Sequence, residues 1–174
     1  MRKKIIFSAI TVLLSIVVIL NILLAICVPA FRLKWTYGFD CQTITTYSYP
    51  EYDRLFIISL CDDILHVDAF YKDKSNIYTH EKGSGFATRD NACAISVYLE
   101  TVNGNTDFTH LWVYARVVDS PNTREFIDTD GIHIDIDTFT IDDKNIEIAT
   151  CITNKSIGSA WINEQLQKRG SEYE

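Results

Sequence analysis

The segment ACAISVYLETVNGNTDFTHLWVYARVV (residues 92–118) decides the fold class, because apolar side chains occupy every second position in both of its halves. This period of two is that of a β-strand with one buried face. One face of the first half would carry Cys93, Ile95, Val97 and Leu99, and one face of the second half Leu111, Val113, Ala115 and Val117. The connecting Asn103-Gly104-Asn105 readily takes the positive φ angles of a tight turn. The segment predicts an antiparallel β-hairpin.

The same period continues on both sides of this hairpin. Further strands are predicted at residues 54–61, 64–71, 131–141 and 145–152, with turns at paired aspartates between them. In the third of these, Ile132, Ile134 and Ile136 would point inward, and the alternation shifts near Thr138, as at a β-bulge. The polar stretch Lys72–Asn91, which contains Gly83-Ser84-Gly85, is expected to form a mobile loop.

Only the C-terminal segment departs from the period of two. Trp161, Ile162 and Leu166 lie on one side of a helix expected at Ser159–Arg169, and Gly170 is a helix-stop signal. The pattern therefore predicts an all-β domain, an antiparallel sandwich or barrel of about 6–8 short strands, with a short C-terminal helix. An α+β fold is the alternative, in which the helix lies against one face of the sheet.

The N-terminal segment is of a different kind. Ile5 to Phe31 is a run of 27 residues without a charge, flanked by Arg2, Lys3 and Lys4 before it and by Arg32 and Lys34 after it. About 20 apolar residues are enough for a helix to cross a bilayer. The excess of basic residues on the N-terminal side favours an amino terminus in the cytoplasm. We therefore expect a single-pass protein: a cytoplasmic stub and transmembrane anchor at residues 1–35, inserted in the lipid bilayer through residues 5–31, and one β-rich domain outside the cytoplasm at residues 36–174.

Three alternatives to an anchor exist. A secretory signal peptide could be cleaved near Ala30, but its apolar region would be unusually long. Leu24-Ala25-Ile26-Cys27 has the form of a lipoprotein box, although bulky Ile26 stands where a small residue is usual. A buried helix of a soluble domain would need a larger host than the remaining chain. The anchor explains the run best.

Charge limits the classes of partner. All 23 acidic residues follow Phe31, together with 13 of the 16 basic ones, so the domain carries −10 while the whole chain carries −7. Nucleic acids and anionic lipid headgroups are recognised through basic surfaces. The sequence therefore argues against both as partners.

Four cysteines lie in the domain, at Cys41, Cys61, Cys93 and Cys151. An even number outside the cytoplasm permits two disulfides, with three possible connectivities. No C-x-x-C spacing is present, so neither a zinc knuckle nor a thioredoxin-like site is indicated. The alternative is that some are free, buried thiols.

Two groups of residues are candidate binding sites. His133, Asp135 and Asp137 share a strand face, with Asp128 and Asp130 in the preceding turn. Such a cluster could hold Ca²⁺ or, with the histidine, a transition metal. The simpler interpretation, which we adopt, is an acidic sheet edge that discourages edge pairing. The second group, Trp112, Tyr114 and Arg116, follows His110 on one strand face and has the composition of a binding hot spot. If the terminal helix covers that face, the row belongs to the core.

Two weaker features complete the candidates. His66 and Asp68 share a strand face, where they could form a general base or an ordinary cross-strand pair. Asn154-Lys155-Ser156 is a glycosylation triplet, a sequence common by chance.

No signature of catalysis is present: neither a G-x-S-x-G elbow, nor a phosphate-binding glycine loop, nor H-E-x-x-H. We therefore expect a membrane-anchored, non-catalytic binding domain displayed outside the cytoplasm, with a protein partner and without a cofactor. The alternative is a metal-dependent domain, Ca²⁺-binding or hydrolytic, that uses the cluster from Asp128 to Asp137.

Overall fold

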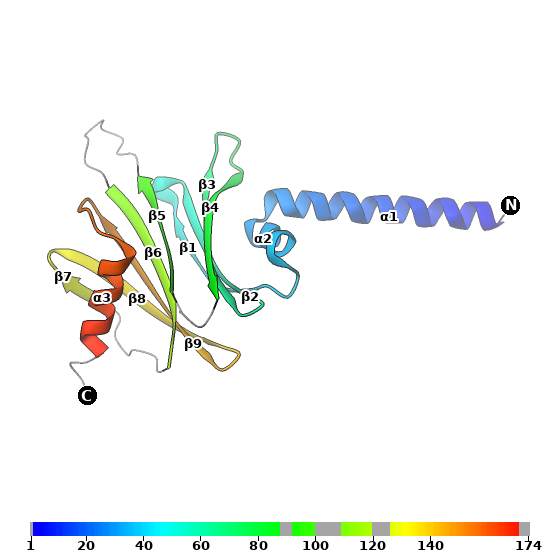
Figure 1. Ribbon diagram of the computed structural model, residues 1–174. Helices are drawn as coiled ribbons and strands as arrows, with labels where there is room; N and C mark the ends of the chain where they lie inside the picture. The colour runs from blue at the N-terminus through cyan, green and yellow to red at the C-terminus, as the bar shows by residue number, and fades with distance from the viewer. Residues whose placement is uncertain (1, 88–91, 100–108, 120–125, 171–174) are drawn as a thin grey trace.

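The computed structural model describes residues 2–87, 92–99, 109–119 and 126–170. Two antiparallel sheets pack face to face, and a helix covers the outer face of each (Figure 1). The expected all-β fold with an N-terminal apolar helix and a short C-terminal helix is thus confirmed. The predicted turn at Asn103-Gly104 lies outside the described residues.

The first sheet, called sheet A here, contains the first four strands in sequential order. They are β1 (Gln42–Tyr49), β2 (Arg54–Cys61), β3 (Ile64–Lys72) and β4 (Tyr78–Ala87), with the 3-10 helix η1 (Pro50–Tyr52) between β1 and β2. Asp62 and Asp63, both at positive φ, make the tight turn between β2 and β3 that the sequence indicated. Each strand is therefore joined to its neighbour by a short connection.

The second sheet, sheet B, has the order β5-β6-β9-β8-β7 among the described residues. Its strands are β5 (Ala92–Leu99), β6 (Thr109–Val118), β7 (Phe126–Thr129), β8 (Ile132–Ile141) and β9 (Lys144–Thr153). Positive φ angles at Asp130 and Gly131, and again at Asp142 and Asp143, close the β7–β8 and β8–β9 turns. The central strands β6 and β9 are mostly buried on both faces.

The main core lies between the two sheets. Its buried residues include Phe56, Ile58, Val67, Val113 and Ile148, each with no exposed surface. Full burial of one such side chain stabilises the fold by about 1.5–3 kcal/mol. In β3, β5, β6 and β9 apolar residues alternate because one face of each strand is buried in this core, as the sequence indicated.

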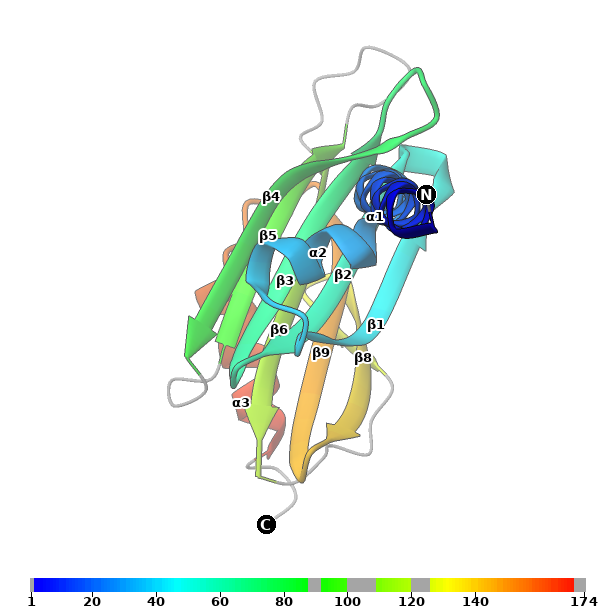
Figure 2. The same ribbon diagram turned by 90° about the vertical axis from the view of Figure 1, so that its right-hand side faces the viewer.

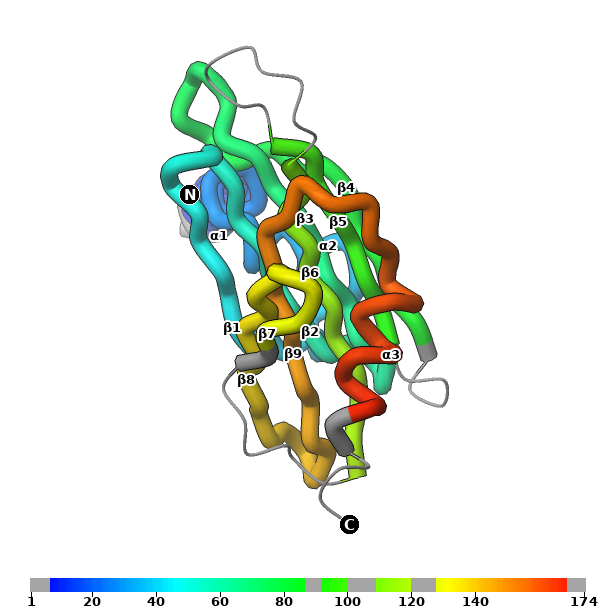
Figure 3. The backbone as a smooth tube through the Cα atoms, turned by 90° about the vertical axis from the view of Figure 1, so that its left-hand side faces the viewer, coloured from blue at the N-terminus to red at the C-terminus, as the bar shows by residue number. Residues whose placement is uncertain are grey.

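A second core lies between the outer face of sheet B and α3 (Ser159–Gly170), and Figure 3 shows this face. Ile132, Ile134 and Ile136 pack here, beneath α3, and not between the sheets. Phe139, further along β8, packs on the core between the sheets. The register between β8 and β9 is continuous, so the predicted bulge near Thr138 is wrong. The apolar phase changes because β8 contributes to a different core on each face.

The stretch Lys72–Asn91 is not the loop that its polarity predicted. Its residues 78–87 form β4, an edge strand that pairs with β3 over its whole length. The turn before it is short, and the Asp73 carboxylate accepts hydrogen bonds from the backbone N–H groups of Ser75 and Ile77. Residues 88–91 lie outside the described part. Polarity misled the prediction because an edge strand exposes most of its side chains.

The N-terminal run forms α1 (Arg2–Cys27), and its segment Phe7–Cys27 is long and apolar enough to cross a membrane, with a mean hydropathy of 3.0. Extended backbone at Val28 ends α1, and Pro29 starts α2 (Pro29–Tyr37). Figure 2, viewed along α1, shows α2 crossing the outer face of sheet A. Leu33 of α2 is buried there against Ile57 and Phe70. The segment directly after the apolar helix is therefore packed on the β-domain.

Candidate functional site

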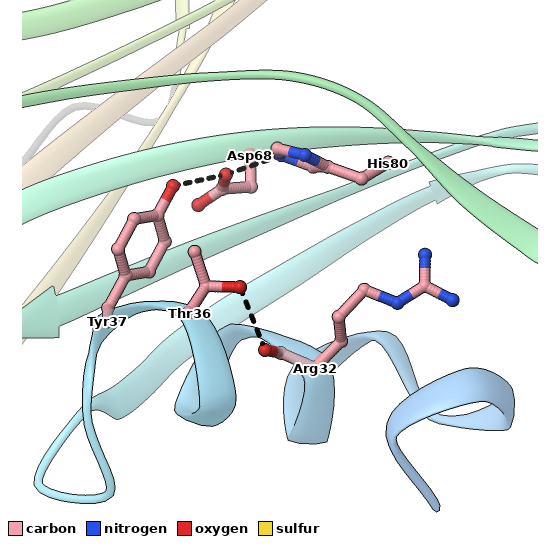
Figure 4. Close-up of polar contacts among 5 residues, drawn as sticks. All are labelled: Arg32, Thr36, Tyr37, Asp68 and His80. Atoms are coloured by element: carbon pink, nitrogen blue, oxygen red, sulfur yellow. Dashed lines mark hydrogen bonds and ion pairs between the residues drawn. The ribbon is translucent and has the colours of Figure 1, made fainter. Parts of the chain in front are cut away.

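Four side chains meet where α2 contacts sheet A, and we call them the junction cluster: Tyr37 of α2, His66 and Asp68 of β3, and His80 of β4. Figure 4 shows Tyr37, Asp68 and His80. The Asp68 side chain is 0% exposed. Its Oδ1 accepts a hydrogen bond from the Tyr37 hydroxyl at 2.9 Å and lies 2.8 Å from His80 Nε2. The Tyr37 ring stacks on the His66 imidazole, with 4.1 Å between ring centroids. The cluster joins the segment after the apolar helix to sheet A.

The local sequence makes room for this cluster with two glycines. Strand alternation puts His66 and Asp68 on the outer face of β3, opposite Gly85 and Gly83 of β4. A Cβ atom on Gly83 would lie 2.3 Å from Asp68 Oδ1, and one on Gly85 would lie 2.4 Å from His66 Nδ1. Both distances are far below van der Waals contact. Side chains at these two positions would displace the cluster.

Burial governs the protonation of the cluster. It raises the pKa of Asp68, and the hydrogen bonds from Tyr37 and His80 oppose that rise. It also lowers the pKa of His66 and, with the nearby Asp68 charge, raises the pKa of Tyr37. Asp68 Oδ2 is buried and has no hydrogen-bond partner among the described residues. Ionised Asp68 therefore depends on few donors, and each of them should matter for stability.

An Asp–His contact of this kind orients an imidazole as in a general base. His80 is the member that reaches solvent, with 36% of its side chain exposed. The sequence had paired His66 with Asp68. In the structure the His66 ring stacks on Tyr37, and it is His80 that contacts the Asp68 carboxylate. The arrangement is suited above all to holding α2 against the sheet.

Sequence reasoning missed Tyr37 and His80. His80 fell in the expected loop, and Tyr37 was in none of the candidate sites. The signal that could have found the site is the pair of patterns His-x-Asp and Gly-x-Gly, because their spacings match across two neighbouring strands. The pairing register is needed to see this match.

The row Trp112, Tyr114 and Arg116 lies beneath α3. Tyr114 is 2% exposed and Trp112 packs on the same core. Arg116 makes an ion pair with the buried Glu147 at 2.7 Å, and its Nη1 is 3.5 Å from Asn163 Oδ1 of α3. The row is therefore largely covered, as in the alternative that the sequence left open. Its part in binding remains a prediction.

The acidic row lies at the β7–β8 edge. His133 is held between two exposed carboxylates, with Nδ1 2.9 Å from Asp128 Oδ1 and Nε2 3.1 Å from Asp135 Oδ1. The hydrogen bond with Asp128, and then that with Asp135, raises the pKa of His133. Asp137 accepts a hydrogen bond from the Tyr47 hydroxyl at 2.5 Å. Asp130 occupies the β7–β8 turn.

No group of three or more His, Cys, Asp or Glu side chains within the described residues is arranged to hold a metal ion. The acidic row is held together by hydrogen bonds to His133 and Tyr47 at the edge of the sheet. A metal-binding role for Asp128, Asp130 and the rest of the row remains a prediction.

The four cysteines of the β-domain divide into one disulfide and two buried thiols. Cys41 and Cys61 are bonded, which joins the start of β1 to the end of β2. Cys93 faces the core between the sheets, whereas Cys151 faces the core beneath α3, so sheet B separates them. Burial raises the pKa of each of these two thiols to about 12. Both are therefore protonated near neutral pH, and each fills space in a core.

Comparison with protein-family models, with curated proteins and with solved structures finds no match to this chain. The molecule is defined by its own features: a β-sandwich of two antiparallel sheets, with one N-terminal helix that is long and apolar enough to span a membrane. A function has to be argued from these features and from the contacts described above.

Proposed function

We propose that this chain is a membrane-anchored, non-catalytic interaction domain that is displayed outside the cytoplasm and recognises a protein partner. The observation that carries the proposal is the docking of α2, which continues from the apolar helix α1 and buries Leu33 against sheet A. Arg32 supports the connection, because its guanidinium donates hydrogen bonds to the carbonyl oxygens of Ala25 and Ile26 at the end of α1. A domain attached in this way is held at a defined angle to its anchor.

This geometry gives the sandwich two different faces. Since α2 lies between α1 and sheet A (Figure 2), sheet A would face the bilayer, and sheet B with α3 would face away from it. Trp35 of α2 and Phe39, which follows the helix, are exposed, with their ring centroids 6.1 Å apart, as suits side chains at headgroup depth. The distal face formed by sheet B and α3 is the surface available to a partner.

Two further features favour a location outside the cytoplasm. The basic residues flanking the apolar run are more numerous on the N-terminal side. The Cys41–Cys61 disulfide is typical of an oxidising compartment. The charge of −10 on the domain makes nucleic acid and anionic headgroups poor partners and favours a neutral or basic one.

The test is a topology experiment on the full chain in its native membrane. One cysteine is added after Glu174 and, in a second variant, one after Met1, both in a Cys27→Ser background. We expect a membrane-impermeant maleimide to label the C-terminal cysteine in intact cells and the N-terminal one only after permeabilisation. The opposite labelling pattern would mean that the β-domain lies in the cytoplasm, contrary to the proposal. Release of the protein by alkaline carbonate, or an amino terminus beginning near Ala30, would rule out the anchor.

A further inference from the structure

Three buried polar atoms on one strand face have no hydrogen-bond partner in the described structure. They are His110 Nδ1, Trp112 Nε1 and the hydroxyl of Tyr114. These residues alternate along β6, so all three project from the same outer face of sheet B. Buried polar groups in native proteins nearly always have partners, and one unpaired group calls for an explanation. Three in succession point to a ligand or to ordered solvent that pairs with them.

Pockets lie at both ends of this row. One of about 400 Å³ is lined by His110 and Trp112 and by the segment that leads into α3, Asn154, Lys155, Ser156 and Ile157. Another of about 240 Å³ lies beside α3 and is lined by Tyr114, by Ala92 and Ala94 of β5 and by residues of α3. The first has the size of a small-molecule site. Tyr114 itself is 2% exposed, so it meets this second pocket from beneath α3, beside the small side chains of β5.

The three atoms restrict the chemistry of the ligand. An indole N–H is only a donor, so the ligand must offer an acceptor to Trp112. His110 Nδ1 and the Tyr114 hydroxyl can each donate or accept. A hydroxyl group can serve all three, because it both donates and accepts. A ligand with several hydroxyl groups therefore fits the row.

Charge argues against an ionic ligand. The domain carries −10, which disfavours an anion. The nearby cations are engaged, since Lys155 donates to the Asp130 carbonyl oxygen and Arg116 pairs with Glu147. A cation would offer no acceptor to the indole of Trp112. The ligand should be neutral.

We propose that the β6 row with its two pockets is a saccharide-binding site. The hydroxyl groups of the saccharide would pair with His110, Trp112 and Tyr114. Its C–H faces would pack on the neighbouring rings, of which Tyr98 and His110 lie 5.8 Å apart and His110 and Trp112 6.3 Å apart. This inference rests on the proposed function, because it names the ligand class for an interaction domain. Saccharide binding does not depend on membrane orientation, so this proposal and the proposed topology can fail independently.

The experiment is a titration of the full chain in phospholipid nanodiscs, free of sugar-based detergent. The protein has three tryptophans, so an indole ¹⁵N–¹H spectrum contains three side-chain signals, assigned with Trp112→Phe, Trp161→Phe and Trp35→Phe. The probes are glucose, galactose, mannose and N-acetylglucosamine with their β- and α-linked trisaccharides. We expect at least one to shift the Trp112 signal in a saturable way.

The variants then test the contacts. Trp112→Phe keeps a ring and removes the N–H, and Tyr114→Phe removes only the hydroxyl. Because Trp112→Phe lacks the indole signal, the affinities of all variants are compared by isothermal titration calorimetry with the saccharide that shifts that signal. Each should weaken binding about tenfold, the effect of one ordinary hydrogen bond. Trp161→Phe, in the same core, should leave affinity unchanged. The proposal is overturned if no saccharide gives a saturable shift, if only the Trp35 or Trp161 signal moves, or if both variants bind like the unmodified protein. If no saccharide gives a saturable shift, the polar atoms of His110, Trp112 and Tyr114 are paired by water alone.

Discussion

Replacement of Tyr37 by phenylalanine tests whether the junction cluster holds α2 on sheet A. The change removes the hydroxyl that donates to Asp68 Oδ1 and keeps the ring that stacks on His66. Asp68 would be left with the contact to His80 alone, because its Oδ2 has no partner. The variant therefore isolates one hydrogen bond to a buried carboxylate.

The expected loss follows from burial. Asp68 is 0% exposed, so water cannot readily replace the lost donor. A hydrogen bond to a charged group contributes about 1.5–3 kcal/mol, and a similar loss in unfolding free energy is expected. For a chain of this size, a loss of 1 kcal/mol lowers the melting temperature by about 2–4 °C. The melting temperature of Tyr37→Phe should therefore fall by roughly 3–12 °C.

The loss should also depend on pH. The raised pKa of Asp68 means that the folded state binds a proton more tightly than the unfolded chain does. Protonation of Asp68 therefore contributes to the unfolding free energy. The full contribution is present below the ordinary Asp pKa, about 3.9, and it is lost as pH rises through the raised pKa of the folded state. Tyr37→Phe removes a bond that opposes the rise, so it raises the pKa of Asp68 further. The stability difference between the two proteins should therefore grow with pH over this window.

The assay is thermal unfolding of the full chain in detergent micelles at several pH values, with trypsin cleavage after Arg32 and Lys34 as a local measure of α2 release. Tyr47→Phe is the control, because it removes a similar hydroxyl that donates to the exposed Asp137. It should change the unfolding free energy by less than about 1 kcal/mol. The reasoning is refuted if Tyr37→Phe costs no more than Tyr47→Phe, or if it lowers stability without faster cleavage in α2.

Three other perturbations have defined outcomes. Gly85→Ala should destabilise the fold by about 1–3 kcal/mol in chemical denaturation, because its Cβ would overlap the His66 ring, whereas Gly158→Ala, with nothing within 4 Å, should have no such cost. Arg116→Ala should cost about 3–5 kcal/mol by the same measurement, because it leaves a buried glutamate unpaired, and a cost below 1 kcal/mol would contradict this. Asp135→Asn with Asp137→Asn should leave the melting temperature nearly unchanged, with EDTA or with millimolar Ca²⁺, Mn²⁺ or Zn²⁺. A metal ion at a hundredfold excess over its Kd would stabilise the fold by about 2.7 kcal/mol and raise the melting temperature by several degrees. Such a rise in the unmodified protein, abolished by the double variant, would establish the row as a metal site.

The sequence predicted the strands whose alternation has a single physical cause. In β3, β5, β6 and β9 every second side chain enters the core between the sheets, so apolar residues recur with period two. The apolar run of β2 is continuous because its other face, with Ile57, packs beneath α2. The sequence missed β1, β4 and β7, which lie at sheet edges, whereas β5, also an edge strand in the described part of sheet B, was predicted because one of its faces is buried. An edge strand buries fewer side chains, so its pattern is weak and its composition resembles that of a loop.

The sequence could not assign buried residues to one core or the other. Ile132, Ile134 and Ile136 were expected to be inside, and they are buried, but beneath α3. Alternation states which residues share a face and leaves open what covers that face. The same limit applies to Trp112 and Tyr114, whose environment depends on where a helix more than forty residues later packs.

The junction cluster shows why the candidate site needed a structure. Asp68 is 31 residues from Tyr37 and 12 from His80, and only the β3–β4 register brings Gly83 opposite the carboxylate. The segment directly after the apolar helix meets there with the Gly-Ser-Gly stretch, which was expected to be a loop. Since α2 fixes where α1 leaves the domain, a substitution in β4 should change how α1 is held relative to the sandwich. Gly83 therefore helps to set the position of the apolar helix, although it lies more than fifty residues beyond the apolar run.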